Sequence, residues 1–374
     1  MPTMTKRTLL TLPRIILLLM LVTALAACSG PDSSESTDAT DAPSTATTIQ
    51  SEPSATSDTG ATTDPPTATT EDGATEPTAT TEPAADPTNT VEPTATVPQP
   101  TATATTASGD DTEGILPTHR IISYYGHPNS EQMGILGEYS IPDLHAKLAE
   151  QAAAYEAADP SHPTVLAFEM IATVAQPWPG DDGTYVVYSG DELIQDYVDY
   201  ATAHDMIVIL DLQIGWDTIP NQINVIRHWL ELPNVHVALD PEFSTKANET
   251  VPNDRVPGEF IGESDGREIQ QAVEMLSQIV AEKQIPSKIL ILHQFETEMI
   301  YNKDAIKPLP GVDIVLDMDG FGSPDAKLGN YDHFVTQELI EYGGIKLFYR
   351  QDDPLLTPEQ IVALDPPALV VIYQ

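Results

Sequence analysis

The segment "NVHVALDPEF", residues 234–243, decides the fold. Apolar residues fill most positions up to Leu239, and Pro241 then interrupts the hydrogen-bonding ladder that a strand requires. Asp240 and Glu242 follow at the point where the apolar run ends. The segment therefore predicts a buried strand that leads directly into two carboxylates, and the question is whether other strands do the same.

Seven further apolar, β-branched segments follow the same pattern along the chain. They are "RIISYYGH" (120–127), "TVLAFEMIATVA" (164–175), "MIVILDLQIG" (206–215), "SKILILHQFE" (287–296), "VDIVLDMDGFG" (312–322), "IKLFYRQD" (345–352) and "ALVVIYQ" (368–374). Eight strands in about 260 residues, alternating with helices, predict a (β/α)8 TIM-type barrel. An open doubly wound sheet is the alternative, but no glycine-rich phosphate loop follows the first strand.

Segments with helical periodicity separate most of these strands. They cover 140–158, 189–205, 219–232, 264–284 and 332–344. Asp265 and Glu268 have the spacing of a capping box at the start of one helix. Gly343-Gly344 are expected to end the last of these helices.

The first 28 residues have the pattern of a secretory signal. Lys6 and Arg7 precede the apolar run "IILLLMLVTALAA", which is short for a membrane-spanning helix, and Cys28 follows. The stretch Leu25-Ala26-Ala27-Cys28 resembles the lipobox of bacterial lipoproteins. This resemblance implies a lipid on the Cys28 thiol, which would anchor the protein at the cell surface, on the outer face of the cytoplasmic membrane. An unprocessed anchor helix is the alternative.

Residues 29–114 differ in composition from the rest of the chain. They are mainly Thr, Ala, Pro, Ser, Asp and Glu, with sixteen acids and no Lys or Arg. Such a segment buries too little apolar surface to offset its ordering entropy, so we expect a disordered linker. Residues 115–374 form the predicted barrel domain, with 41 acids and 13 bases, a formal charge of −28. So acidic a surface argues against nucleic acid as a partner.

Ionisable residues recur at the C-terminal ends of the predicted strands. In a barrel these ends meet at one mouth, where active sites form. The site residues predicted in this way, together with aromatic neighbours, are Tyr125, Asp211, Gln213, Trp216, Asp240, Glu242, His293, Glu296, Asp317, Asp319 and Arg350.

Carboxylates in such a cluster permit general acid and base catalysis, because one holds its proton while another stays ionised. The domain resembles the (β/α)8 glycoside hydrolases, many of which carry their acid/base Glu just after the fourth strand. In "Asp240-Pro241-Glu242" the matching residue is Glu242. The second carboxylate is open: the seventh strand offers Asp352 where the family has a Glu, Asp317 and Asp319 on the sixth strand are the richer candidates, and Asp240 completes the predicted catalytic set. The chain is also similar to uncharacterised bacterial surface lipoproteins with "LDPEF", "LHQFE" and "DGFG", a similarity that implies no activity.

The sequence thus predicts a tethered glycoside-hydrolase-like protein that acts on a carbohydrate or cell-wall polymer, binds no nucleic acid and needs no cofactor. Asp211, Gln213, His293, Glu296, Arg350, Trp216 and Tyr125 would contact the substrate. A metal-dependent hydrolase that holds a divalent cation on the same acids is one alternative. A non-catalytic lipoprotein that binds a glycan or a partner through the mouth is the other.

Overall fold

A computed structural model describes residues 114–374. The predicted signal segment, Cys28 and almost all of the linker 29–114 lie outside this range. No helix among the described residues combines the length and the apolarity that crossing a bilayer requires.

Eight parallel strands close into a barrel, which confirms the predicted fold and excludes the open sheet. The strands are β1 (Arg120–Gly126), β2 (Thr164–Ala175), β4 (Ile207–Gln213), β5 (Val235–Asp240), β7 (Lys288–Gln294), β9 (Val312–Met318), β10 (Tyr342–Leu347) and β11 (Ala368–Tyr373). Each pairs with its neighbour in this order, and β1 closes the ring by pairing in parallel with both β2 and β11.

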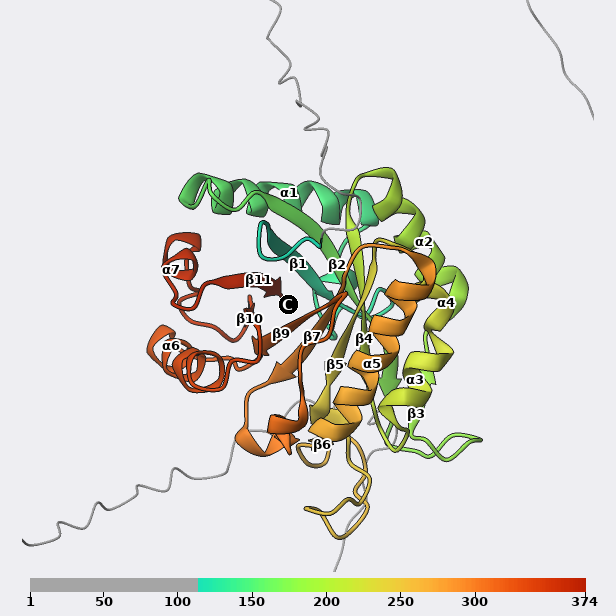
Figure 1. Ribbon diagram of the computed structural model, residues 1–374. Coiled ribbons are helices and arrows are strands. Elements are labelled where there is room, and N and C mark those ends of the chain that lie inside the picture. Colours follow the sequence, from blue (N-terminus) through green and yellow to red (C-terminus); the bar gives the residue numbers. More distant parts are fainter. Residues whose placement is uncertain (1–113) are drawn as a thin grey trace, which may run out of the picture. The chain divides into compact units, whose positions relative to one another are not determined.

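Helices surround the strands (Figure 1). They are α1 (Ile141–Ala158), α2 (Asp191–Ala203), α3 (Ile219–Val225), α4 (Arg227–Leu230), α5 (Gly266–Lys283), α6 (Pro324–Tyr331) and α7 (Pro358–Val362). The 3-10 turns are η1 (Ile135–Gly137), η2 (Pro241–Phe243), η3 (Thr297–Met299) and η4 (Lys303–Ala305), and η5 (Asp332–Thr336) is a π turn. Short β3 (Val186–Tyr188) pairs with β2 in antiparallel, and β6 (Ser264–Asp265) pairs with β8 (Ile300–Tyr301).

Alternate residues of each barrel strand face two different cores. Inside the barrel, Ile121, Ile209, Ile291 and other small or branched residues form one buried cluster. The opposite faces of the strands pack against the helices in a larger cluster. The inward faces therefore carry any side chain that reaches the mouth.

Two expectations about local structure were wrong. The segment 332–344 is not one helix, because α6 begins earlier at Pro324 and the π turn η5 ends at Thr336. Gly343 and Gly344 belong to β10, where a Cβ on Gly343 would lie 2.5 Å from the hydroxyl of Tyr331. The close approach of the helix to the strand, rather than a helix stop, explains this glycine.

The predicted capping box at the start of α5 is also wrong. Asp265 caps the helix, since its side chain accepts a hydrogen bond from the backbone N–H of Arg267. Glu268 instead accepts from the backbone N–H of Ile219 at 3.0 Å. It thereby connects α5 to the start of α3.

Candidate functional site at the barrel mouth

Inward-facing side chains change from apolar to ionisable toward the C-terminal ends of the strands. On β4, Ile209 is followed two residues later by Asp211, and on β9 Val315 is followed by Asp317. Because residues two apart share a face of a strand, the acids extend the inward apolar row toward the mouth. Asp211, Asp240, His293, Asp317 and Asp319 are all buried, and their charges influence one another. The predicted convergence of these residues is therefore confirmed.

His293 lies at the centre of this cluster, between two carboxylates. Its Nε2 is 3.0 Å from Oε1 of Glu169, and its Nδ1 is 2.9 Å from Oδ2 of Asp317. Burial and the nearby Lys346 lower the pKa of His293, but the hydrogen bonds to Asp317 and Glu169 raise it well above its usual range overall. The ring is therefore an imidazolium that donates a hydrogen bond from each nitrogen.

Lys346 supplies the second positive charge. Its Nζ is 3.2 Å from Oδ2 of Asp319 and 3.7 Å from the ring centroid of Tyr125. Burial lowers the pKa of Lys346, but Asp319 and Asp240 raise it above its usual range overall. The hydroxyl of Tyr125 donates to Oδ2 of Asp211 at 2.9 Å. The mouth therefore holds an ion pair between Asp319 and Lys346 beside a tyrosine ring.

Glu242 lies on the 3-10 turn η2, immediately after β5. Asp240 begins this turn, and its Oδ1 accepts a hydrogen bond from the backbone N–H of Glu242 at 3.2 Å. Burial, followed by the negative charge of Asp211, raises the pKa of Asp240 to about 7. Burial, followed by the charges of Asp240 and Asp319, raises the pKa of Glu242 to about 8. Glu242 is therefore protonated at neutral pH, as a general acid must be.

The cluster contains more carboxylates than cations. The acids are Glu169, Asp211, Asp240, Glu242, Asp317 and Asp319, and His293 and Lys346 are the two cations. Four carboxylate oxygens, one each on Glu169, Asp211, Asp317 and Asp319, are buried without a hydrogen-bond partner. Buried acceptors of this kind require hydrogen-bond donors or a cation to offset the cost of their burial.

His293, Asp317 and Asp319 are the residues that could hold a metal ion. Each offers one ligand atom, and these atoms lie within 4.8 Å of one another. However, both ring nitrogens of His293 already face carboxylates, and a protonated nitrogen has no lone pair for a metal. Metal binding would require His293 to lose a proton and to give up its hydrogen bond with Asp317.

Four other predicted site residues make contacts of their own. Gln213 accepts from the backbone N–H of Ala175 at 2.9 Å, and Trp216 donates from its indole N–H to the carbonyl of Arg255 at 2.8 Å. Glu296 is exposed and begins the turn η3.

Arg350 is exposed and pairs with Glu138 at 2.5 Å in a groove outside the barrel interior. Its position beyond the end of β10 explains why it does not face the cluster.

The candidate set missed Lys346 and left out Glu169. Lys346 lies two residues after Gly344 on the inward face of β10, between the outward-facing Ile345 and Leu347. A lone lysine that alternates with apolar residues in a strand is the signal that could have found it. Glu169 carries the same signal within β2.

Comparison with known proteins gives similarities at the level of the barrel. No protein-family model matches the chain, and no curated protein matches it. Similar solved structures include the cellulose synthase subunit Z (CcsZ) from Clostridioides difficile, with 9% identity, a TM-score of 0.36, and coverage of 69% of this chain and 92% of that chain. A GH26-CBM35 β-(1,4)-mannanase of Podospora anserina shares 10% identity over 68% of this chain and 56% of its own, with a TM-score of 0.32.

The Bacillus subtilis mannanase BCman shares 10% identity over 69% of this chain and 81% of its own, with a TM-score of 0.31. The class of this protein, a (β/α)8 barrel with an acidic mouth, rests on its own strand pairing and side chains.

Proposed function

We propose that the barrel is a glycoside-hydrolase-like enzyme that acts on a carbohydrate or cell-wall polymer. The observation that carries this proposal is the contrast between two carboxyl groups at the mouth. Burial raises the pKa of Glu242 to about 8, so that it holds a proton, while Asp319 forms an ion pair with Lys346 at 3.2 Å. Glycoside hydrolysis uses one carboxyl group in each of these states.

In the proposed reaction Glu242 donates its proton to the glycosidic oxygen as the bond to the anomeric carbon breaks. Asp319 either attacks that carbon or takes a proton from the attacking water, and the separation of the two carboxyl groups decides which. Asp240 positions the acid, since it accepts from the backbone N–H of Glu242. Lys346 pairs with Asp319, with its Nζ 3.2 Å from Oδ2 of that residue, and so places a positive charge beside the second carboxyl group.

The test compares hydrolysis of soluble glycans and cell-wall polymers by the full chain and its variants. Glu242→Gln is expected to lower kcat by about 10²–10⁴-fold, which is the usual contribution of a general acid. The matched control is Glu298→Gln, an exposed glutamate on the turn after β7, which should leave kcat unchanged. Activity should fall as pH rises through about 8, because Glu242 loses its proton there. Full activity of Glu242→Gln would contradict the proposal.

A metal-dependent hydrolase is the second candidate, favoured by the proximity of His293, Asp317 and Asp319. A bound divalent cation would activate a water molecule as the nucleophile. Activity that EDTA abolishes and that an added divalent cation restores supports this candidate over the first. Glycan binding without turnover, in the presence or absence of metal, would instead support a non-catalytic receptor.

We further propose that a lipid on Cys28 tethers the barrel to the outer face of the cytoplasmic membrane, with residues 29–114 as the spacer. The support is the lipobox-like sequence before Cys28, the single cysteine of the chain. The full chain should fractionate with membranes, and Cys28→Ser should release it into the medium or the soluble fraction. Equal membrane association of the variant would contradict lipid anchoring and favour an anchor helix.

A further inference from the structure

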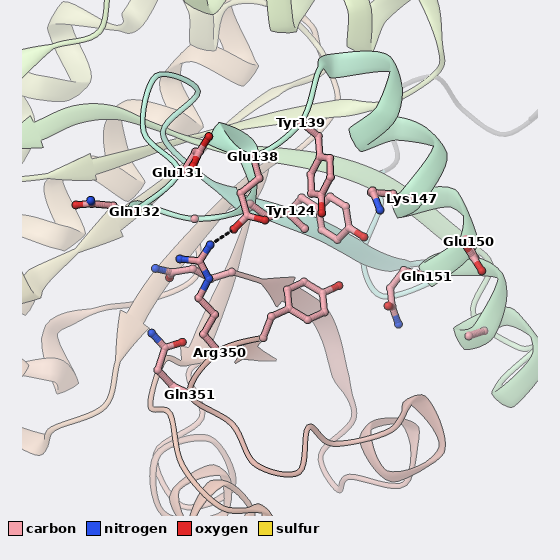
Figure 2. A pocket seen from close by; sticks show the side chains of 15 residues that line it. Tyr124, Glu131, Gln132, Glu138, Tyr139, Lys147, Glu150, Gln151, Arg350 and Gln351 are labelled. Carbon is pink, nitrogen blue, oxygen red and sulfur yellow. Dashed lines mark hydrogen bonds and ion pairs between the residues drawn. The ribbon is translucent and has the colours of Figure 1, made fainter. Parts of the chain in front are cut away.

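A second concave surface lies outside the barrel interior, between α1 and the loops that follow β1 and β10. It is a groove of about 580 Å³. Figure 2 shows its side chains, with Tyr124 and Tyr139 near β1, Lys147 and Gln151 on α1, and Arg350 after β10. This volume is within the range of small-molecule sites.

Tyrosine rings form the apolar part of the groove. Tyr139 and Tyr349 are 41% and 40% exposed, high values for large aromatic side chains. The ring of Tyr349 stacks on Tyr373 at 5.3 Å and meets the edge of Tyr124 at 6.5 Å. These contacts hold Tyr349 in place while much of its surface stays open to solvent, so a ligand that covers it need not order it first.

Amide and charged side chains form the polar part. Arg350 pairs with Glu138 at 2.5 Å, and Nζ of Lys147 lies 4.5 Å from the ring centroid of Tyr139. The amides are Gln132, Gln151, Gln351 and Gln374, and the remaining acids are Glu131 and Glu150. Amides both donate and accept hydrogen bonds, and carboxylates accept two or more.

The charge of the groove is close to balanced, with three carboxylates and two cations among its lining residues. The chain as a whole has a formal charge of −41. The net negative charge of the groove would repel a strongly anionic ligand. A strongly cationic ligand would bind more favourably to the more acidic parts of the protein surface. The groove therefore favours a neutral ligand with apolar faces and many hydroxyl groups.

We propose that this groove binds a neutral glycan chain as a second carbohydrate site, separate from the acidic mouth. Sugar rings present C–H faces that cover the exposed tyrosines, and their hydroxyls exchange hydrogen bonds with the glutamines and with the Glu138–Arg350 pair. Arg350 and Asp352 belong to the same loop, and Asp352 accepts from the backbone N–H of Gly322 beyond β9. A chain held in the groove is thus close to the β10 loop at the rim of the mouth. The proposal goes beyond catalysis, because the groove binds whether or not the mouth hydrolyses.

The test follows individual tyrosine signals by NMR in the full chain with labelled tyrosine rings, in a Glu242→Gln background that is expected to slow turnover. Cellohexaose, mannohexaose and xylohexaose are the neutral probes, and polygalacturonate is the anionic probe. The signals of Tyr139 and Tyr349, assigned through Tyr→Phe variants, should shift with at least one neutral probe. Tyr342, at the opposite end of β10, is the internal control and should not move.

A double variant, Tyr139→Ala with Gln351→Ala, should weaken this binding by about tenfold or more, equivalent to about 1.4 kcal/mol. Phe260→Ala, which removes an exposed aromatic ring outside the groove, should leave the affinity unchanged. Absence of shifts at Tyr139 and Tyr349 with every neutral probe at millimolar concentration would overturn the proposal, and so would a response to polygalacturonate alone. Hydrolysis by the wild type together with unmoved groove signals would reject the groove and leave the mouth proposal intact.

Discussion

The two ends of the barrel each bury a lysine, and the two lysines are in opposite electrostatic surroundings. Lys288, at the start of β7, donates from Nζ to the carbonyl oxygens of Leu232 and Val235, the latter at 2.8 Å. Burial without a carboxylate partner lowers its pKa to about 7. Lys346, toward the end of β10, lies among carboxylates that raise its pKa despite its burial.

The difference shows what distinguishes a buried ionisable group from a functional site. At the N-terminal end of the barrel, burial favours the neutral forms of Lys288 and of the partly buried Asp313, whose pKa burial and Glu341 raise to about 7. At the mouth, opposite charges within hydrogen-bonding distance keep His293 and Lys346 ionised. The arrangement at the mouth thus keeps charged groups on the inward faces of the strands at neutral pH.

The largest expected effect comes from removing the cation at the mouth. Lys346→Met removes the nearer of the two cations beside the buried Asp319 and leaves only His293, whose Nδ1 is 3.7 Å away, so the free energy of unfolding should fall by about 3–5 kcal/mol. The hydrolytic activity proposed for the mouth should also be lost. Urea unfolding of the full chain measures the first effect, and glycan hydrolysis under native conditions measures the second.

Lys288→Met is the matched variant at the opposite end. It removes a lysine whose pKa is near 7 and leaves carbonyl groups unsatisfied, so the free energy of unfolding should fall by about 1–3 kcal/mol. The kcat should stay unchanged, because Lys288 lies far from the mouth along the strands. Equal destabilisation by the two variants would show that burial alone, rather than charge pairing, distinguishes the two lysines.

The stability contributed by the ionisable groups at the two ends of the barrel should change with pH in opposite directions. Asp240 and Glu242 have pKa values of about 7 and 8 in the folded protein, against about 4 when unfolded. The stability that these two carboxyl groups contribute to the folded protein is therefore fully present below about pH 4 and is lost as pH rises through 7 to 8. Lys288, with a lowered pKa of about 7, contributes in the opposite direction, because its penalty disappears as pH rises toward its unfolded value of about 10.

Thermal unfolding across this pH range measures both contributions. The double variant Asp240→Asn, Glu242→Gln should gain Tm relative to the wild type as pH rises from about 5 to about 8. For Lys288→Met, the Tm relative to the wild type should instead fall as pH rises. A difference in Tm that does not change with pH for either variant would show that these groups titrate normally.

The smallest expected effect concerns the loop of residues 244–263 beside the mouth. The indole N–H of Trp216 donates to the carbonyl of Arg255 in this loop, and Trp216→Phe removes that bond at a cost of about 0.5–1.5 kcal/mol. The loop should then be cleaved faster by proteases under native conditions. Trp178→Phe, which changes an exposed indole, is the control and should be cleaved at the wild-type rate.

Periodicity predicted the barrel because all eight strands are apolar and most of them are separated by helical segments. The same reasoning brought Asp211, Asp240 and Asp317 together, since position along a parallel strand fixes which end a side chain faces. Glu242 was found in the same way, although it lies on a turn that Asp240 caps.

The prediction failed around β10, and one local error explains both the omission of Lys346 and the placement of Arg350 in the predicted site. Gly343-Gly344 resemble a helix stop, so the strand was expected to begin at Ile345 and to end near Asp352. In the structure β10 begins at Tyr342 and ends at Leu347, which places Lys346 at the mouth and Arg350 beyond it. Only tertiary contacts show why two glycines lie in this strand: Tyr331 packs against Gly343, and Val315 and Asp317 pack against Gly344.

Gly344 affects the geometry of the mouth through its lack of a side chain, although it carries no charge. A Cβ at this position would lie 3.1 Å from Oδ1 of Asp317, which is tighter than ordinary van der Waals contact. A single methyl group there would press on the carboxylate that faces Nδ1 of His293, while every ionisable residue of the cluster stays in the chain. The geometry of this mouth is therefore sensitive to side-chain volume as well as to charge, and a substitution at position 344 would change the volume without changing the charge.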